Sequence, residues 1–507
     1  MPRLKQAESY KNADTSTLLK KARQVVNAEL GRSAIFRGND LDDLPRFDAS
    51  EIVLGKVVGR GGFGVVRELT GVKLRSDLPA LSNNSIRSVE KDNDNVEMRG
   101  ENENESAAAL NDNSRHDSNR SSGGGSGKAG ERNSNRQTNG TGRWGSFFRR
   151  SGSRGGSGSF YSASNEASTN VPDAREYLAR QVWNNKRGKL YVVKQVDPEL
   201  IHSEKVTFLK GTIDLALETH YLASLSHPHI LGIKGICCRS PFETTDYFII
   251  LDQLQEILAR RLVQWMHQKR AITGITGVLT GGRGKSRQLL VERLLVAYDI
   301  ADAMKYLHTR SIIFRDLKPD NIGFDGEGTL KLFDFGLAKE LREEERTDDG
   351  LYHMTGLTGA IRYMAPEVGL RQPYNLKADV YSWSMLMWYI MALEPPLGLY
   401  TPNMFIQKVF QLGIRPAMKD SWPSKLKDLM TCCWSEHIEE RPDFTQIMDV
   451  LREHVCAVDP QTIAFLGEMP SGTTTLPIPH HADIRSSDAN SVGCGVSDSS
   501  IELVLNE

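Results

Sequence analysis

The stretch at residues 312–336 constrains the fold of this chain more than any other. It places Asp316 and Asn321 five residues apart on one loop, with Lys318 between them, and Asp334 follows after a predicted β-hairpin. Carboxylate, amide and ammonium groups in this order suit phosphoryl transfer, which needs a base, oxygen ligands for Mg²⁺ and a cation near the moving phosphate. A single aspartate in a polar loop is usually a solvated turn residue, but the ordered set indicates a functional loop.

The composition of the 507-residue chain excludes several other classes of protein. Its length suits two to four average domains, and a formal net charge of -1 gives no support for broad binding to nucleic acid or an anionic membrane. None of the six cysteines stands in a C-x-x-C spacing, which favours free thiols in a reducing compartment. The N-terminus lacks the apolar core of a signal peptide, and the most apolar run, residues 381–393, is too short to span a bilayer. We therefore expect a cytoplasmic protein with no membrane span and no nucleic-acid partner.

A glycine turn forms the second motif. Residues 52–66 contain two β-rich runs on either side of this turn, which predicts a hairpin. Its glycines, which allow backbone N–H groups to approach phosphate oxygens, are Gly59, Gly61 and Gly64. In a dinucleotide-binding fold such a turn would open a helix, whereas β-branched Val66 continues a strand here. A Walker-type phosphate loop ending at Ser286 is rejected, because Leu279 stands where that motif needs a glycine.

Together these motifs resemble those of the eukaryotic protein kinase family, and the resemblance covers residues 52–70 and 174–455. It implies an α+β fold of two lobes, a small β-rich N-lobe and a larger helical C-lobe, that binds ATP and Mg²⁺. Lys194, inside an apolar strand, resembles the family's phosphate-orienting lysine. Glu218 shares the apolar stripe of the next predicted helix and would pair with Lys194.

The resemblance also implies a role for each site residue. Asp316 would be the base and Lys318 would stabilise the transferring phosphate, while Asn321 and Asp334 would hold Mg²⁺. The strand at residues 247–254 would lead into the hinge between the lobes and offer backbone groups to adenine. The implied ATP-binding residues are Gly59, Gly61, Gly64, Val66, Lys194, Glu218, Asp252 and Leu254.

Other positions would support this site. Asp379 matches the buried helix aspartate that braces the catalytic loop, and Arg441 would pair with Glu367. Both roles are structural. Arg315 can pair with a phosphate on the activation segment, which ends at Glu367. The predicted targets of an upstream kinase are Thr355 and Thr358.

Lys318, two residues after Asp316, resembles the serine/threonine class, and the wider pattern is similar to the tyrosine-kinase-like group. We therefore predict a serine/threonine kinase that transfers the γ-phosphoryl group of ATP to Ser/Thr hydroxyls of protein substrates in intracellular signalling. The alternative is a catalytically weak pseudokinase that serves as an ATP-binding scaffold. Phe314 in place of a histidine, Ala360 in place of a Ser or Thr and the long insertions favour it, but every charged group that the chemistry needs is present.

Three further departures cluster around the expected adenine site. Val192 replaces a usual alanine above the ring, and Gly323 replaces a large apolar residue below it. Phe333 is bulky where a small residue often precedes Asp334. The hypothesis is a compensated pocket, in which Phe333 fills the volume vacated at Gly323.

The domain organisation follows from composition. Residues 1–48 form a polar N-terminal extension, whose amphipathic stretch at residues 18–26 either docks on the main domain or is marginal. The kinase domain covers 52–455, interrupted by a disordered insertion at about 71–172 and a short insertion at about 271–287, with strand character expected at 177–183. A disordered tail covers 459–507.

Overall fold

The computed structural model describes residues 10, 13–37, 41–75, 173–184, 191–274 and 282–459. The chain divides into two compact units, Met1–Pro79 with Pro172–Glu507 and Ala80–Val171, and the described residues all belong to the first. Most of the insertion expected at 71–172 and nearly all of the expected tail lie outside the described residues.

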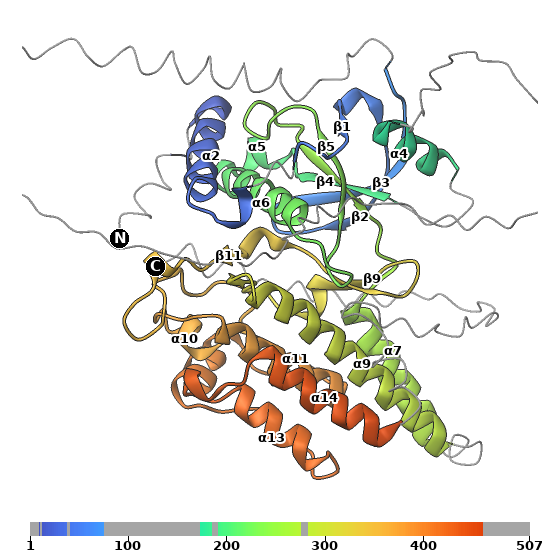
Figure 1. Cartoon of the computed structure of the whole chain (residues 1–507), viewed down its shortest axis with the longest axis vertical. Coiled ribbons are helices and arrows are strands. Elements are labelled where there is room, and N and C mark those ends of the chain that lie inside the picture. Colours follow the sequence, from blue (N-terminus) through green and yellow to red (C-terminus); the bar gives the residue numbers. More distant parts are fainter. Residues whose placement is uncertain are drawn as a thin grey trace, which may run out of the picture. The chain divides into compact units, whose positions relative to one another are not determined.

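A six-stranded sheet forms the core of the N-lobe (Figure 1). The apolar runs of its central strands are buried because helices cover the sheet. Its order is β1-β5-β6-β4-β3-β2, antiparallel except for the β1–β5 pair. The strands are β1 (Arg46–Phe47), β2 (Ile52–Arg60), β3 (Gly64–Val72), β4 (Tyr191–Val196), β5 (Ile233–Cys237) and β6 (Phe248–Asp252).

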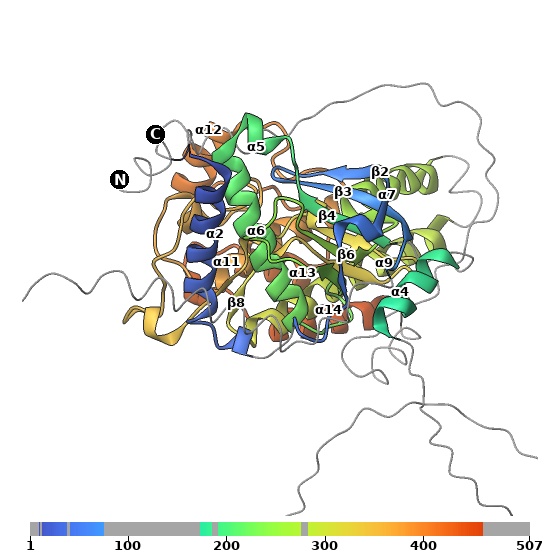
Figure 2. The same cartoon turned by 90° about the horizontal axis from the view of Figure 1, so that it is seen from above.

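Helix α6 (Lys205–Ser224) is the main helix of the N-lobe, and it packs against β4 and β5. Leu215, Glu218 and Leu222 are buried on one face of α6, as their spacing of three and four residues predicts. Figure 2 shows α2 (Thr15–Leu30) running alongside α6. The short helix α5 (Leu200–Ser203) precedes α6.

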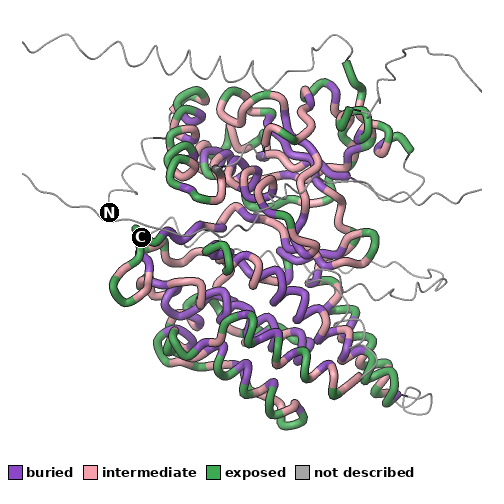
Figure 3. Tube along the Cα trace, viewed as in Figure 1, coloured by how far each residue is buried: buried purple, intermediate pink, exposed green. Residues whose placement is uncertain are grey.

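The C-lobe is helical and is built around α11 (Lys377–Ala392), which is buried almost all round as expected for a core helix. It packs against α9 (Gly282–His308) and α13 (Ser424–Cys433), and buried residues run along these helices in Figure 3. Helix α14 (Phe444–Val458), opened by a capping box at Asp443, packs against α9. The remaining helices are α7 (Leu258–Thr273), α10 (Pro366–Gly369), α12 (Pro402–Met404) and a π-helix at Phe405–Gln411.

Short strands of the C-lobe carry the catalytic loop. The predicted hairpin before Asp334 is confirmed as β9 (Ile322–Phe324) and β10 (Leu330–Leu332), and β9 also pairs with β7 (Glu256–Ile257). A second small sheet joins β8 (Ile312–Ile313) to β11 (Lys339–Glu340). The catalytic loop therefore leaves β8 and enters β9, with both ends fixed.

Several expected boundaries differ from the structure. The strand expected at 177–183 is wrong, because this stretch is helix α4 (Ala174–Trp183), whose buried Leu178 and Val182 lie four residues apart as on one helix face. Gly71 and Val72 belong to β3 rather than to the insertion. Both ends of the short insertion expected at 271–287 are helical, since α7 reaches Thr273 and α9 begins at Gly282. None of the described helices is both long and apolar enough to cross a membrane.

Candidate active site

The glycine turn joins β2 to β3, as predicted. Gly59 pairs with Val66 across the hairpin, and the Gly61 N–H donates to the Gly64 carbonyl at 2.9 Å. A Cβ on Gly64 would lie 3.0 Å from the carbonyl oxygen of Gln195 on β4, so the close approach of the two strands favours glycine there. Val66 in turn pairs with Lys194. The hairpin and Lys194 are therefore neighbours in one sheet.

Lys194 lies between two carboxylates. Its Nζ is 2.6 Å from Glu218 Oε2 on α6 and 3.0 Å from Asp334 Oδ1, so the expected pairing with Glu218 is confirmed. Burial alone would lower the pKa of Lys194, but the charges of Asp334 and Glu218 raise it above its ordinary value. The Lys194 ammonium lowers the pKa of Asp334. This arrangement fixes an ionised Asp334 beside a charged lysine.

The catalytic loop gathers the other predicted groups around Asp316. Lys318 Nζ is 2.9 Å from Asp316 Oδ2, and the side-chain amide of Asn321 donates to the same oxygen at 2.8 Å and to the Asp316 carbonyl at 2.9 Å. Burial would lower the pKa of Lys318, but the Asp316 charge produces a net upward shift. The structure thus brings Asp316, Lys318 and Asn321 within direct contact.

Ala360 contacts the same aspartate through its backbone. Its N–H donates to Asp316 Oδ1 at 3.0 Å, on the side of the carboxylate opposite the contact with Lys318. The preceding Gly359 has φ 92°, and a Cβ there would lie 2.2 Å from the carbonyl oxygen of Arg315. The missing hydroxyl at position 360 therefore does not leave Asp316 without partners.

Asp379 on α11 holds the backbone of the catalytic loop, as predicted. Its Oδ2 accepts from the Phe314 N–H at 2.8 Å, and its Oδ1 accepts from the Arg315 N–H at 2.9 Å. His308 Nε2, 3.0 Å from Oδ2, adds a partner that no sequence motif predicts. Phe314 is fully buried and meets Phe335 edge-on at 5.2 Å. Phe314 thus keeps an aromatic packing role.

The activation segment meets the catalytic loop at Arg315. Its Nη1 donates to Thr355 Oγ1 at 3.3 Å, and its Nε donates to the Leu337 carbonyl at 2.6 Å. The Thr358 hydroxyl lies 3.1 Å from that of Thr355. Both predicted target threonines therefore lie near the guanidinium that we expect to receive a phosphate.

Arg441 and Glu367 form the predicted ion pair, in which Nη1 donates to Oε1 at 2.6 Å and Nη2 donates to Oε2 at 2.9 Å. Both side chains are buried, so the pair fixes the end of the activation segment to the C-lobe.

The packing around Gly323 differs from the compensated pocket that we expected. A Cβ on Gly323 would lie 2.6 Å from Leu254 Cδ1 and 3.1 Å from the Glu256 carbonyl oxygen. The atoms that approach Gly323 most closely therefore belong to Leu254 and Glu256, not to Phe333. Asp252, at the end of β6, pairs with Lys234 at 3.0 Å. The glycine thus makes room for the hinge leucine, a long-range contact that the sequence does not reveal.

One acidic residue near the site was missed. Asp214 lies one turn before Glu218 on α6, and a Cβ on Gly336 would be 3.1 Å from Asp214 Cβ. Burial, followed by the charge of Asp334, raises the pKa of Asp214 to about 7. The four-residue spacing from Glu218 was a signal that could have found it.

A glycine hairpin beside a lysine–glutamate pair, with an Asp-Lys-Asn loop between two lobes, defines a protein kinase. Residues 179–451 match the family model described as "Protein tyrosine and serine/threonine kinase". This match spans more than half of the 507 residues, and the chain belongs to that family.

Curated relatives carry related names. The chain is 29% identical to "Serine/threonine-protein kinase STY17" of Arabidopsis thaliana, over 52% of this chain and 40% of that protein. It is 37% identical to "Serine/threonine-protein kinase STY46" of the same plant, over 52% of this chain and 39% of that protein. It is 29% identical to "Serine/threonine-protein kinase TNNI3K" of Homo sapiens, over 49% of this chain and 27% of that protein. The chain thus spans well under half the length of these three relatives.

Proposed function

We propose that this protein is an ATP-dependent serine/threonine kinase, similar to the tyrosine-kinase-like group, that phosphorylates Ser and Thr hydroxyls of protein substrates inside the cell. The contact of Asp316 with both Lys318 and Asn321 carries the proposal, because it joins a base, a cation and an amide oxygen ligand in one loop. Membership of the kinase family and the names of the relatives support it.

Each group has a defined part in this proposal. Asp316 accepts the proton of the attacking hydroxyl, and Lys318 offsets charge on the phosphoryl group as it moves. Lys194, held by Glu218, orients the ATP phosphates under the hairpin of Gly59, Gly61, Gly64 and Val66. Backbone groups of Asp252 and Leu254 receive the adenine.

The donor set fits a Mg²⁺ ion. Asn321 uses its amide N–H groups on Asp316, so its carbonyl oxygen is the group left for a hard cation. Asp334 has a lowered pKa and uses one carboxylate oxygen on Lys194, which leaves the other as a ligand. When bound, Mg²⁺ would neutralise charge on the ATP phosphates.

We further propose that an upstream kinase phosphorylates Thr355 or Thr358. A phosphate on either residue would bring two negative charges close to Arg315, and a charge-assisted hydrogen bond would hold the activation segment against the catalytic loop. The domain limits expected above, with a kinase domain over 52–455, also stand as a proposal.

The test measures transfer of labelled γ-phosphate from ATP to a generic basic protein, followed by phosphoamino-acid analysis. We expect phosphoserine and phosphothreonine from the wild-type protein and almost none from Asp316→Asn, a matched variant that removes the base. Equal labelling by both proteins would overturn the enzymatic function, and phosphotyrosine alone would overturn the class.

A further inference from the structure

The N-terminal segment, residues 13–37, contacts two elements of the proposed active site. Helix α2 in this segment buries Leu18, Leu19, Ala22 and Val26, and the first three of them belong to the main hydrophobic core. Its neighbour is α6, which carries Glu218, and Lys205 at the start of α6 donates from Nζ to the Ala13 carbonyl at 2.7 Å. The amphipathic stretch therefore docks rather than remaining marginal.

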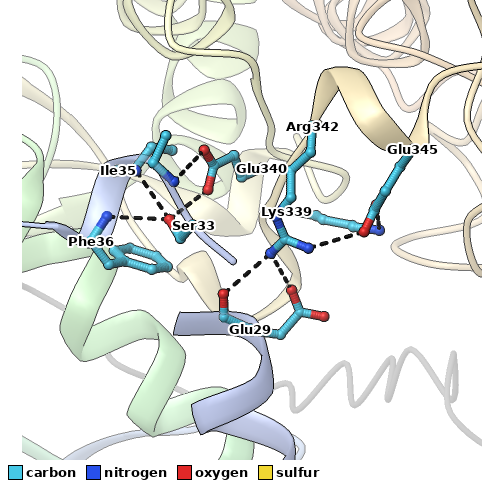
Figure 4. Close-up of polar contacts among 9 residues, drawn as sticks. Glu29, Ser33, Ile35, Phe36, Lys339, Glu340, Arg342 and Glu345 are labelled. Atoms are coloured by element: carbon cyan, nitrogen blue, oxygen red, sulfur yellow. Dashed lines mark hydrogen bonds and ion pairs between the residues drawn. The ribbon is translucent and has the colours of Figure 1, made fainter. Parts of the chain in front are cut away.

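The turn after α2 binds Glu340, which lies six residues beyond Asp334 (Figure 4). Ser33 Oγ donates to Glu340 Oε2 at 2.5 Å, and the Ala34 N–H donates to Oε1 at 3.0 Å. Ser33 and Glu340 are 3% and 6% exposed. Both oxygens of this carboxylate thus take hydrogen bonds from the N-terminal segment, and both bonds are lost if the segment departs.

A second polar contact lies beside the first. Arg342 Nη2 is 2.6 Å from Glu29 Oε2 at the end of α2, while its Nη1 is 3.0 Å from Glu345. Glu345 also pairs with Lys339 at 2.9 Å (Figure 4). The Arg342 side chain is only 4% exposed, whereas Glu29 and Glu345 are 40% and 30% exposed, so the network is buried at its arginine and open to solvent at its carboxylates.

Aromatic packing links the segment to both active-site elements. Phe36 meets Tyr221 of α6 edge-on at 4.9 Å. Tyr221, one turn beyond Glu218, lies 6.3 Å from the ring of Phe335, the residue that follows Asp334. The N-terminal segment therefore contacts α6 and, through Tyr221, the segment that begins at Asp334.

We propose that the N-terminal segment is an intrachain positioning element, and that the surface formed by α6 and residues 339–345 is its docking site. Lys194 bonds at once to Glu218 on α6 and to Asp334, so its placement depends on how these two elements sit relative to one another. The segment holds both, and release of the segment lowers the rate of phosphoryl transfer. This inference rests on the proposed kinase function.

The test places a second carboxylate beside Glu340 in the full chain. Ser33→Asp should displace the segment, increase amide hydrogen exchange in α2 and α6, and lower the kinase rate about tenfold, within the range of ordinary coupling between sites. The double variant Ser33→Asp with Glu340→Gln should recover most of the rate, because a carboxamide can donate to the new carboxylate. The control is Gln24→Asp, which adds the same charge on the exposed part of α2.

The outcomes separate this inference from the kinase function. Faster exchange in α2 with unchanged exchange in α6 and an unchanged rate would overturn the positioning role. If the wild-type protein has no transferase activity, the proposed kinase function is refuted. Amide hydrogen exchange in α6 of the Ser33→Asp variant would still show whether the N-terminal segment docks there. If Ser33→Asp does not fold, Phe36→Ala, which removes the contact with Tyr221, provides the same comparison.

Discussion

Asp379→Asn tests how the catalytic loop is held. In the wild-type protein, Asp379 Oδ2 accepts hydrogen bonds from the Phe314 N–H and from His308, and Asp379 Oδ1 accepts one from the Arg315 N–H. An asparagine that keeps its oxygen at the Oδ2 position retains two of the three bonds. Its NH₂ group then faces the Arg315 N–H, so the bond to Arg315 is the one that is lost.

The magnitude follows from these bonds. A buried N–H without a partner costs about 1–3 kcal/mol, and the loss of charge on the other bonds adds about 1 kcal/mol. Arg315 has φ 68°, a left-handed conformation that a non-glycine residue keeps only when its surroundings enforce it. We therefore expect the free energy of unfolding to fall by about 2–4 kcal/mol, the backbone next to Asp316 to relax, and kcat to fall more than the ATP Michaelis constant changes.

The assay is thermal unfolding combined with steady-state kinetics of phosphoryl transfer. A loss of this size corresponds to a fall in Tm of about 3–6 °C for a folded domain of roughly 300 residues. The control is Asp449→Asn, which removes an exposed pair with Arg452 and should cost less than about 1 kcal/mol. A Tm within 1 °C of the wild type, with unchanged kcat, would refute the reasoning.

Three other predictions follow from individual contacts. Gly323→Leu should displace Leu254 and raise the ATP Michaelis constant about tenfold, the equivalent of 1.4 kcal/mol, as measured by initial rates. Asp214 has a pKa of about 7 in the folded protein against an ordinary 3.8. In the unfolded chain this carboxyl therefore ionises at a lower pH than in the folded protein, and the free energy of unfolding falls as the pH rises from 3.8 to about 7. Asp214→Asn should therefore stabilise the protein by about 2 kcal/mol at a pH of roughly 5.5 and about 4 kcal/mol at a pH of roughly 8 in denaturant unfolding. Glu51→Gln should lower stability by about 2–4 kcal/mol and speed hydrogen exchange in α4, because the buried carboxylate of Glu51 lies 2.6 Å from Arg175.

Each has a matched control. Gly284→Leu should leave the Michaelis constant unchanged, since no atom beyond its chain neighbours and the local backbone of α9 lies within 4 Å of a Cβ there. Equal Michaelis constants for Gly284→Leu and Gly323→Leu would contradict the packing of Leu254 against Gly323. Asp428→Asn, which removes a carboxylate at an exposed position, is the comparison variant. A stability difference between Asp214→Asn and wild type that does not change with pH would refute the raised pKa of Asp214. Glu176→Gln removes an exposed ion pair with Arg180 and is the control for Glu51→Gln. If amide hydrogen exchange in α4 is the same in both variants, Glu51 does not hold α4 through Arg175.

Local spacing made much of the fold and the candidate site predictable. The hairpin glycines, the stripe that carries Glu218 and the loop around Asp316 each depend on residues close in sequence, and motif order then placed Lys194. The pair of Arg441 and Glu367 was predictable only through the family resemblance, since 74 residues separate them.

Features that depend on distant partners were not predictable. Ser33 donates a hydrogen bond to the carboxylate of Glu340, which is 307 residues away, and no sequence pattern near either residue predicts this contact. Leu254 rather than Phe333 supplies the side-chain atoms nearest to Gly323, because β7, which follows the hinge, pairs with β9. The helix α4 was mistaken for a strand because its sequence holds only two buried apolar residues, Leu178 and Val182.

The most direct test of the central claim compares ATP binding and γ-phosphoryl transfer in the wild-type protein and in Asp316→Asn. We predict that both proteins bind Mg²⁺–ATP with similar affinity, because Lys194 and Asp334 are untouched, and that transfer to a protein substrate falls by about 10²–10⁴-fold in the variant. Nucleotide binding by both proteins with no transfer by either would contradict the enzymatic account and support a scaffold.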